Sequence, residues 1–547
     1  MLLPILSIGM GKEQDNDVQN FIQNALKILN IDPSLTNLLL TISSVFFVKG
    51  LFVFVSKYWS ANMAISLKKT IQQLLSQKYS ELYYGHFTGL KTGWLSNILM
   101  HESGLFSQGF SEFIRIQTSL IFIFAYIIAA TILMPKLTIA ISIFGILIFL
   151  PMRIIMHKVR NISRNLTAEY GFLNASIVEY ADSFPYTKAT GSVFRFCNKI
   201  KTNIQHVMNL EKRLNFFSAL IGTLPELIAV FSLAGLIFTH VVLLNGNLSE
   251  IIVVSLLFYR IIGNILNLQG QWQRFNSTFG SIELIENTFN EFELNREPPG
   301  KIQLDNLNIP IRFQNVSLTV GNNPILNNVS FCIHPNQTVG IVGPSGAGKS
   351  SILKLLTCLL VPTKGKIKFG DLDCRDVNVS SFRKKIGYVP QNPTIISGTL
   401  YENINFGFFK NKDKHAIKSV TRVMKLVGLD DMIEQIEKQM GEKGSQISGG
   451  QKQRITLARE LIREPELLIL DEPTSALDDI NENLVMKTLN RLKNKKTIVI
   501  ISHRASSVKN CDNIIVIENG TLLNSGSFEY LKRNCKKFNK LYSRQEI

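Results

Sequence analysis

Long apolar runs dominate the first 300 residues of the chain, whereas shorter apolar runs alternate with polar segments in the remainder. Five runs approach the length of roughly 20 residues that an α-helix needs to cross a bilayer. The predicted spans are Leu35–Ser56, Ile116–Met134, Leu137–Met152, Phe216–Leu244 and Ile251–Leu268. The pattern therefore predicts an α-helical transmembrane domain over residues 1–291.

Charge between the spans predicts their orientation. The stretch 57–115 has six basic and three acidic residues, and the stretch 153–213 has ten basic and four acidic residues. The segment 11–35 has only two basic residues against four acidic ones. Basic residues accumulate on the cytoplasmic side of membrane helices, so the two long stretches are predicted to be cytoplasmic.

Two features precede the first predicted span. The apolar run Met1–Met10 predicts the outer end of an incomplete first helix, and a signal peptide is the alternative. Residues 17–30 place apolar side chains on one helical face. This segment is either an external helix that lies on the membrane and contacts a lipid substrate, or a helical link packed on neighbouring spans.

The second half of the chain contains a phosphate-binding motif in its expected context. The apolar strand predicted at Thr338–Val342 leads into the sequence GPSGAGKS, and a helical pattern begins at Ser351. Glycines at such a turn let backbone N–H groups converge on phosphate oxygens at a helix N-terminus. The residues predicted to bind the nucleotide here are Gly343, Ser345, Gly346, Gly348, Lys349, Ser350 and Ser351.

Polar side chains at the ends of other predicted strands complete a candidate ATPase site. The run LLILDE ends in Asp471, which fits a Mg²⁺ ligand together with the Ser350 hydroxyl, and in Glu472, which fits a base for the attacking water. Gln391 and His503 follow two further predicted strands. Open α/β sheets bind ligands at the carboxyl ends of their strands, so these side chains are predicted to meet.

Composition narrows the class of partner. The chain has a formal net charge of +18, but no nucleic-acid-binding motif accompanies it, so we expect a solvated face near anionic lipid and no nucleic-acid partner. The six cysteines show no metal-ligand spacing and lie in predicted cytoplasmic regions, so reduced thiols are expected.

These motifs together resemble the nucleotide-binding domain of ABC transporters over about Ile311–Leu531. The family's order is reproduced by GPSGAGKSS, YVPQ, GEKGSQISGGQKQR, LLILDEPTSALD and ISHR. The resemblance implies an exporter-type half-transporter, with an α/β P-loop NTPase domain at 311–547 and a linker at 292–310. It also implies that the cytoplasmic stretches turn through short coupling helices, which we place near His101–Phe106 and Phe184–Ser192.

The same resemblance implies how the site is assembled. ATP and Mg²⁺ would bind between two chains, because one copy supplies the P-loop and Glu472 while the other supplies Ser448, Gly449 and Gly450. Gln391 would contact Mg²⁺, His503 would contact the γ-phosphate, and Asp478 would lie in a loop that crosses the interface. Every motif is intact, which favours a homodimer over a heterodimer.

The resemblance is less specific about the substrate. The overall pattern is similar to bacterial flippases for lipid-linked oligosaccharides, and lipid A flippases and multidrug or peptide exporters share most of these motifs. The implied location is the bacterial inner membrane, with the ATPase domain in the cytoplasm. A membrane-anchored ATPase that regulates a channel or receptor is the alternative from another class.

Two further hypotheses concern individual residues. Lys49 and Arg260 lie deep in predicted spans, where an unpaired cation is costly and usually faces a cavity or partner. They are candidate contacts for an anionic substrate, and pairing with Glu226 is the alternative. The family's adenine-stacking aromatic aligns with Val320, so weaker base stacking is expected unless Phe313 covers the base.

Overall fold

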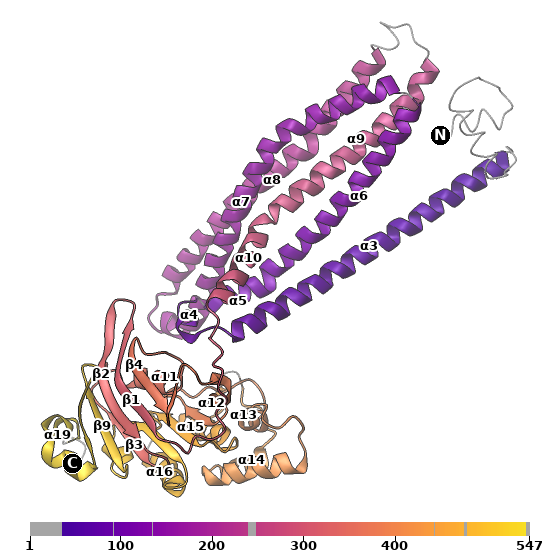
Figure 1. Ribbon diagram of the computed structural model, residues 1–547. Coiled ribbons are helices and arrows are strands. Elements are labelled where there is room, and N and C mark those ends of the chain that lie inside the picture. Colours follow the sequence, from indigo (N-terminus) through magenta and orange to yellow (C-terminus); the bar gives the residue numbers. More distant parts are fainter. Residues whose placement is uncertain are drawn as a thin grey trace. The chain divides into compact units, whose positions relative to one another are not determined.

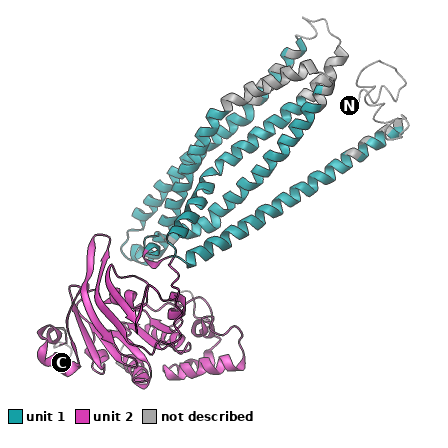
Figure 2. Cartoon of the chain, viewed as in Figure 1, with its two compact units in different colours: residues 1–82, 86–296 teal, residues 83–85, 297–547 magenta. Residues whose placement is uncertain are grey.

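The computed structural model describes residues 35–90, 92–133, 135–238, 248–441, 444–474 and 479–542. They form two compact units (Figure 2), each described here by itself. Unit 1 extends to Arg296 except for the segment Tyr83–Gly85, and unit 2 contains that segment and the chain from Glu297 onward. The predicted incomplete helix at Met1–Met10 and the amphipathic segment 17–30 lie outside the described residues.

Unit 1 consists of long α-helices that run side by side in Figure 1. The longest, α7, has 55 residues and therefore extends about 80 Å at 1.5 Å per residue, far beyond the roughly 30 Å hydrocarbon core. The described part of each predicted span accordingly lies within a longer helix. The long helices are α3 (Leu35–Ser80), α6 (Ser103–Leu133), α7 (Pro135–Ala189), α8 (Val193–Phe238), α9 (Leu248–Ser277) and α10 (Phe279–Leu294).

Polar contacts between helices fix the packing of unit 1. Helix α6 packs on α9, and α7 packs on α8. The carboxylate of Glu112, which is 2% exposed, lies 3.1 Å from Arg274 of α9 and 2.8 Å from Arg115.

Among the described residues, Leu39–Ser80 and Gly93–Ile128 are long and apolar enough to cross a membrane.

The first predicted coupling turn, near His101–Phe106, is wrong. The chain reverses earlier, through the short helix α4 (Tyr84–Phe87). It then continues through α5 (Thr92–Asn97) and a π-helical segment, Ile98–Glu102, directly into α6. Glu102 is fully buried and accepts a hydrogen bond from Asn97 Nδ2 at 3.1 Å, so its charge does not mark an exposed turn. The second turn, between α7 and α8, lies within the predicted Phe184–Ser192 region.

Unit 2 contains two β-sheets. The larger has six strands in the order β10-β9-β3-β8-β7-β6, and the smaller has four in the order β2-β1-β4-β5. The larger sheet contains β3 (Thr338–Val342), β6 (Ile386–Val389), β7 (Leu467–Asp471), β8 (Thr497–Ile501), β9 (Asn513–Glu518) and β10 (Thr521–Gly526). The smaller contains β1 (Ile311–Val320), β2 (Asn323–Ile333), β4 (Lys364–Phe369) and β5 (Leu372–Asp373). The predicted strand Thr338–Val342 is confirmed, and so is the strand expected before Gln391, which is Ile386–Val389.

Continuous apolar strands make the larger sheet the centre of unit 2. All five residues of both β3 and β8 are buried, as expected for parallel strands covered on both faces. Alternate residues enter two different cores: Leu468 packs in one cluster and Ile469 in the other. The second cluster also contains side chains of the smaller sheet, such as Phe313 and Phe369.

Short helices cover the two faces of the larger sheet (Figure 1). Residues of α11 enter the same core as the smaller sheet, whereas those of α13 to α16 enter the other core. The helices are α11 (Lys349–Leu356), α12 (Val379–Arg383), α13 (Leu400–Asn405), α14 (Lys414–Leu426), α15 (Gly449–Leu461), α16 (Asp479–Leu492), α17 (Ala505–Val508), α18 (Phe528–Asn534) and α19 (Lys536–Tyr542).

A buried arginine holds one of these helices to its neighbours. Arg459 of α15 is 6% exposed, and its guanidinium donates to the Asn403 carbonyl oxygen at 2.7 Å, Asn403 Oδ1 at 3.0 Å and the Thr394 carbonyl oxygen at 2.8 Å. If the arginine is removed, its buried acceptors are left without hydrogen bonds. The free-energy penalty of those unpaired groups exceeds the net stabilisation that the hydrogen bonds provide.

We therefore expect Arg459→Ala to lower the free energy of unfolding of unit 2 by about 2 kcal/mol or more. The matched control is Arg422→Ala, because Arg422 and its partner Glu464 are both about two thirds exposed and such pairs contribute little. Thermal unfolding of the purified full chain measures both. Equal midpoints for the two variants would contradict the prediction.

Candidate ATPase site

The candidate site lies at one edge of the larger sheet. Strands β3, β8, β7 and β6 are neighbours and run parallel, so their carboxyl ends meet at this edge. The P-loop follows β3, Gln391 follows β6, and His503 follows β8. Asp471 and Glu472 stand where β7 ends. Four polar segments that are distant in sequence are therefore placed together by strand pairing alone.

Two P-loop glycines are required by space and backbone conformation. A Cβ atom on Gly343 would lie 2.1 Å from the carbonyl oxygen of Ile517 in β9. Gly348 has a φ of 101°, and a Cβ there would lie 2.7 Å from Leu326. Gly346, by contrast, faces open space, so its backbone leaves room for a phosphate group.

Lys349 begins α11 with its ammonium group inside the loop. The residue is 6% exposed, and Nζ donates to the carbonyl oxygens of Gly343 and Pro344, both at 2.8 Å. Burial lowers its pKa, while the nearby carboxylates of Glu472 and Asp471 oppose that shift. A buried ammonium at a helix N-terminus fits a polyphosphate anion, so the residues present fit ATP.

The other predicted P-loop residues lie around this ammonium group. Ser345, Gly346 and Ser350 are exposed, and Ser351 is half-buried. Their backbone and hydroxyl groups are accessible to a ligand.

Glu472 lies between two other predicted catalytic residues. Its Oε1 atom is 3.0 Å from His503 Nε2, and its Oε2 atom accepts a hydrogen bond from Gln391 Nε2 at 2.8 Å. The backbone of Glu472 has a φ of 48°, which is uncommon for a residue with a side chain, and its N–H donates to the Ile501 carbonyl oxygen at 2.9 Å. Strained conformations of this kind cluster at functional sites.

Burial sets the protonation of the site. It raises the pKa of Asp471, and the neighbouring Glu472 carboxylate raises it further. Burial also lowers the pKa of His503, and the Lys349 ammonium adds to that effect, while the Glu472 carboxylate opposes it.

Sequence reasoning missed one residue of this cluster, Tyr388. Burial, together with the nearby Asp471 carboxylate, raises the pKa of its hydroxyl to about 12. The signal was available, because Tyr388 is the first letter of the YVPQ motif and lies on β6 beside β7.

The residues also fit Mg²⁺. Among the described residues no cluster of three or more His, Cys, Asp or Glu side chains could hold a metal. Asp471, the Ser350 hydroxyl and the Gln391 amide are oxygen donors, and Mg²⁺ is usually held by one or two carboxylates together with substrate phosphates and water. When bound, the ion would neutralise charge on the phosphates.

A second polar turn begins α15. The hydroxyl of Ser448 accepts from the Gln451 N–H at 3.2 Å, and the Gln451 side chain accepts from the Ser448 N–H at 3.0 Å. This capping box leaves Ser448 and Gly449 exposed, while Gly450 is buried. Asp478 lies outside the described residues.

The hypothesis that Phe313 covers the adenine is wrong. Phe313 is 2% exposed and stacks on Phe331 with ring centroids 4.3 Å apart, inside the core. Val320 is half exposed at the end of β1. The paired strand β2 reaches the P-loop, because a Cβ on Gly348 would lie 3.2 Å from the Ile325 carbonyl oxygen.

The candidate substrate residues lie in unit 1, and both are exposed. Lys49 Nζ lies 5.8 Å from the centroid of the Phe46 ring and 5.9 Å from that of the Phe122 ring. Within the described ranges, neither Lys49 nor Arg260 forms an ion pair with Glu226. A pocket of about 600 Å³ between α7 and α9 is lined by further basic residues, Arg153, His157, Lys158 and Arg160.

Two family profiles match the chain. The profile of the ABC transporter transmembrane region matches residues 8–266, and the ABC transporter profile matches residues 326–475. The chain therefore belongs to the ABC transporter family. It is an ATP-dependent exporter, with a helical transmembrane domain and an ATP-hydrolysing domain on one chain.

Three similar proteins match most of this chain and most of their own length. The heterocyst differentiation ATP-binding protein HepA of Nostoc sp. is 26% identical over 91% of this chain and 82% of its own. A Rickettsia felis protein named as an export ATP-binding/permease protein is 29% identical over 95% and 91%, respectively. The solved structure of a bacterial Atm1-family ABC exporter with ATP bound has the same fold, with a TM-score of 0.83 and 22% identity over 94% of this chain and 91% of that one.

The site geometry predicts the effect of removing one charge. Glu472→Gln should reduce ATP turnover at least a hundredfold while ATP still binds, since the amide fits between Gln391 and His503 but cannot act as a base.

Lys349→Ala should instead weaken ATP binding itself. Phosphate release and binding of a fluorescent ATP analogue measure the two effects. Near-normal hydrolysis by Glu472→Gln would exclude Glu472 as the base.

The exposed position of Val320 predicts a gain of affinity. Val320→Tyr should tighten ATP binding about fivefold or more, because stacking of a base on an aromatic contributes about 1–3 kcal/mol. Val320→Leu is the matched control, which adds apolar volume without a stacking face. If both variants bind ATP as the wild type does, Val320 does not face the base.

Proposed function

We propose that this exporter acts as a homodimer in a bacterial inner membrane and translocates an anionic, lipid-linked substrate such as a lipid-linked oligosaccharide. The observation that supports it most is the placement of Glu472 between Gln391 and His503 at the P-loop edge of the sheet. A chain that carries all of these side chains does not need a different chain to supply catalytic residues. Two identical copies can therefore form two complete ATPase sites.

The proposed chemistry assigns a role to each side chain. Glu472 polarises a water molecule for attack on the γ-phosphate, and Gln391 holds its carboxylate in place. When ATP is bound, the His503 imidazole would exchange its contact with Glu472 for a hydrogen bond donated to the γ-phosphate. Lys349 would stabilise phosphate charge, and Ser350, Asp471 and Gln391 would hold Mg²⁺, which neutralises charge on the phosphates when bound.

The second copy would complete each site. Ser448 and Gly449 are exposed at the start of a 13-residue helix, and their own hydrogen bonds are to Gln451 within that turn. Backbone N–H groups at a helix N-terminus favour an anion, so this turn suits the γ-phosphate bound by another copy. ATP would thus close two ATPase domains, and hydrolysis would release them.

Charge in unit 1 supports an anionic substrate. Arg260 and Lys49 are cations within predicted spans that are exposed in the described chain, and basic residues also line the pocket between α7 and α9. The cost of an unpaired cation in a span falls when it faces a water-filled cavity. A phosphate or pyrophosphate head group would neutralise such a cavity.

Reconstitution of the purified chain alone tests the proposal. Proteoliposomes that contain a lipid-linked oligosaccharide should show ATP-dependent translocation and stimulated ATPase activity. Stimulation by lipid A or by drugs instead would redirect the substrate assignment. ATPase activity that no candidate stimulates would favour the regulatory alternative, and activity only after a different chain is added would exclude the homodimer.

Substitution of the span cations tests substrate charge. We expect Arg260→Ala to reduce flipping of the lipid-linked oligosaccharide about tenfold and to leave basal ATPase activity within about threefold. Lys49→Ala should have the smaller effect, since an ammonium binds phosphate at one point. Arg195→Ala, an exposed arginine outside the predicted spans, is the control. Normal flipping by the double variant would contradict an anionic substrate.

A further inference from the structure

The chain that enters unit 2 is bound along one short segment of it. The Ile302 N–H donates to the Asp376 carbonyl oxygen at 3.0 Å, and the Ile302 carbonyl oxygen accepts from the Asn378 N–H at 2.7 Å. Two residues later, the Leu304 N–H donates to Ser381 Oγ at 3.1 Å. Residues 297–304, here called the docked linker, are therefore bound by the segment 376–383, which includes α12.

A glycine permits this close approach. A Cβ atom on Gly300 would lie 1.9 Å from the Val377 carbonyl oxygen, closer than two such atoms can come. The backbone of the docked linker therefore lies directly on the backbone of the segment before α12. A side chain at this position would separate the two.

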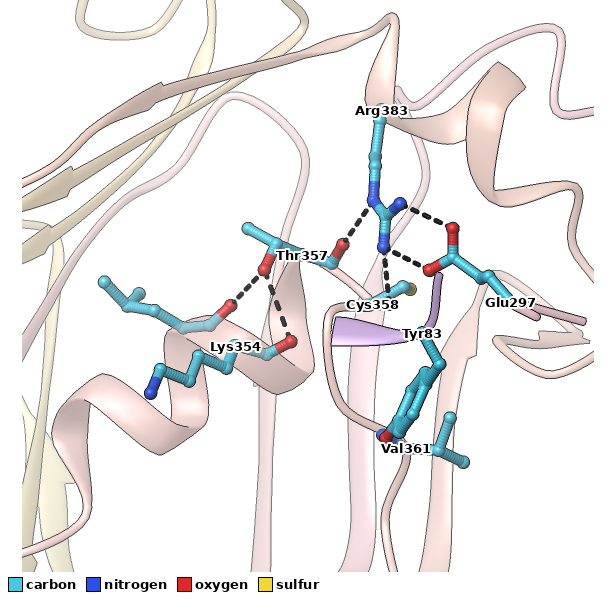
Figure 3. A network of polar contacts seen from close by, with 8 residues as sticks. Tyr83, Glu297, Lys354, Thr357, Cys358, Val361 and Arg383 are labelled. Carbon is cyan, nitrogen blue, oxygen red and sulfur yellow. Dashed lines mark hydrogen bonds and ion pairs between the residues drawn. The ribbon is translucent and has the colours of Figure 1, made fainter. Parts of the chain in front are cut away.

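Arg383, the last residue of α12, joins the docked linker to a third element. Its guanidinium forms a bidentate pair with Glu297 at 2.7 and 2.8 Å. The same group donates to the carbonyl oxygens of Thr357 at 3.3 Å and Cys358 at 2.8 Å (Figure 3). These carbonyls stand just past the end of α11, where a cation is favoured by the helix dipole.

Polar side chains therefore lie at both ends of helix α11. Its first residue is Lys349 of the P-loop, and it has eight residues, so it is only about 12 Å long. Just beyond its far end the Val361 N–H donates to the Tyr83 hydroxyl at 3.3 Å (Figure 3). The Lys354 ammonium lies 5.5 Å from the centroid of the Tyr84 ring. The segment Tyr83–Gly85 is flanked in sequence by unit 1 on both sides.

We propose that Arg383 is a positioning residue that couples the P-loop helix to the docked linker, so that ATP bound at the start of α11 changes how tightly the linker is held at its end. The proposal rests on ATP binding at the P-loop. Only an arginine can make all four contacts at once, because its planar fork binds a carboxylate through two donors while its remaining donors reach the carbonyls.

Limited proteolysis of the full-length protein measures the linker directly. Trypsin cuts after Lys301, which is exposed, but cleavage requires local opening because Ile302 is hydrogen-bonded on both sides. Quantifying the new N-terminus at Ile302 by mass spectrometry, with and without a non-hydrolysable ATP analogue, gives the opening of the linker. In the wild type we expect slow cleavage whose rate the analogue changes at least threefold.

Two variants separate the linker contact from the helix contact. Glu297→Gln loses the ion pair but leaves Arg383 able to bind the Thr357 and Cys358 carbonyls, so cleavage should accelerate about tenfold and lose its dependence on the analogue. Arg383→Gln should accelerate cleavage to the same extent. Arg383→Lys should be cleaved more slowly than Arg383→Gln but faster than the wild type. Asp305→Asn, which removes another exposed carboxylate from the same stretch, should cleave as the wild type does.

ATP binding and basal hydrolysis distinguish positioning from a structural role. Both should stay within about twofold of wild type in Glu297→Gln, because the site residues are unchanged. Cleavage in Glu297→Gln that still responds to the analogue would overturn the proposal, as would equal acceleration in Asp305→Asn. Gly300→Ala separates the linker from the Val377 backbone and leaves Arg383 unchanged, so it should also accelerate cleavage after Lys301. Cleavage as slow as in the wild type would contradict the proposal. A wild type that fails to bind the analogue would instead refute ATP binding at the P-loop.

Discussion

The parallel pairing of β7 with β6 and β8 is the constraint on which the ATPase site depends. Asp471 pairs with Ile501 in register, so the two carboxylates after Leu470 emerge beside the loop that contains His503. The backbone N–H of Glu472 donates to the Ile501 carbonyl oxygen, which continues this pairing one residue beyond the strand. The left-handed conformation of Glu472 then turns its carboxylate toward Gln391 and His503. The cost of that conformation, of order 1–3 kcal/mol, is offset by the buried strands on either side.

Most of this site could be predicted from the sequence because it is built from strand ends. Apolar runs of four or five residues predicted β3 and β6 correctly, and parallel strands necessarily bring their final residues to one edge. What the sequence could not supply is which side chains face each other across that edge. Tyr388 illustrates this, since the YVPQ motif contains it but only the structure shows that the Asp471 carboxylate is close enough to raise its pKa. Phe313 is the opposite case, because its register places it in the core on Phe331.

The helical unit was less predictable for a related reason. Apolar runs mark where a helix meets lipid, but these helices extend far beyond any bilayer, and polar residues in the extensions can face the interior. The turn expected near His101–Phe106 is an example, because Glu102 in that region is buried beside Asn97 within a continuous helical segment. A charged residue in the sequence does not by itself distinguish an exposed turn from a buried, hydrogen-bonded position, because its carboxylate has polar neighbours in both cases. Tyr83 and Tyr84, at the actual reversal, belong to unit 2 together with their partners Val361 and Lys354.

Helix α11 shows why a short helix is well suited to link binding with movement. Its N-terminal end must accommodate a change of several negative charges when ATP binds or phosphate leaves, and its C-terminal carbonyls are bound by a single guanidinium. Leu355 and Leu356 of this two-turn helix are fully buried, and close-packed interiors have low compressibility and transmit strain. In the coupling that we propose, Arg383 would transmit a displacement of this helix to Glu297, the first residue of the docked linker. The sequence distance between Lys349 and Glu297 hides this connection, which exists only because α12 returns the chain to the end of the P-loop helix.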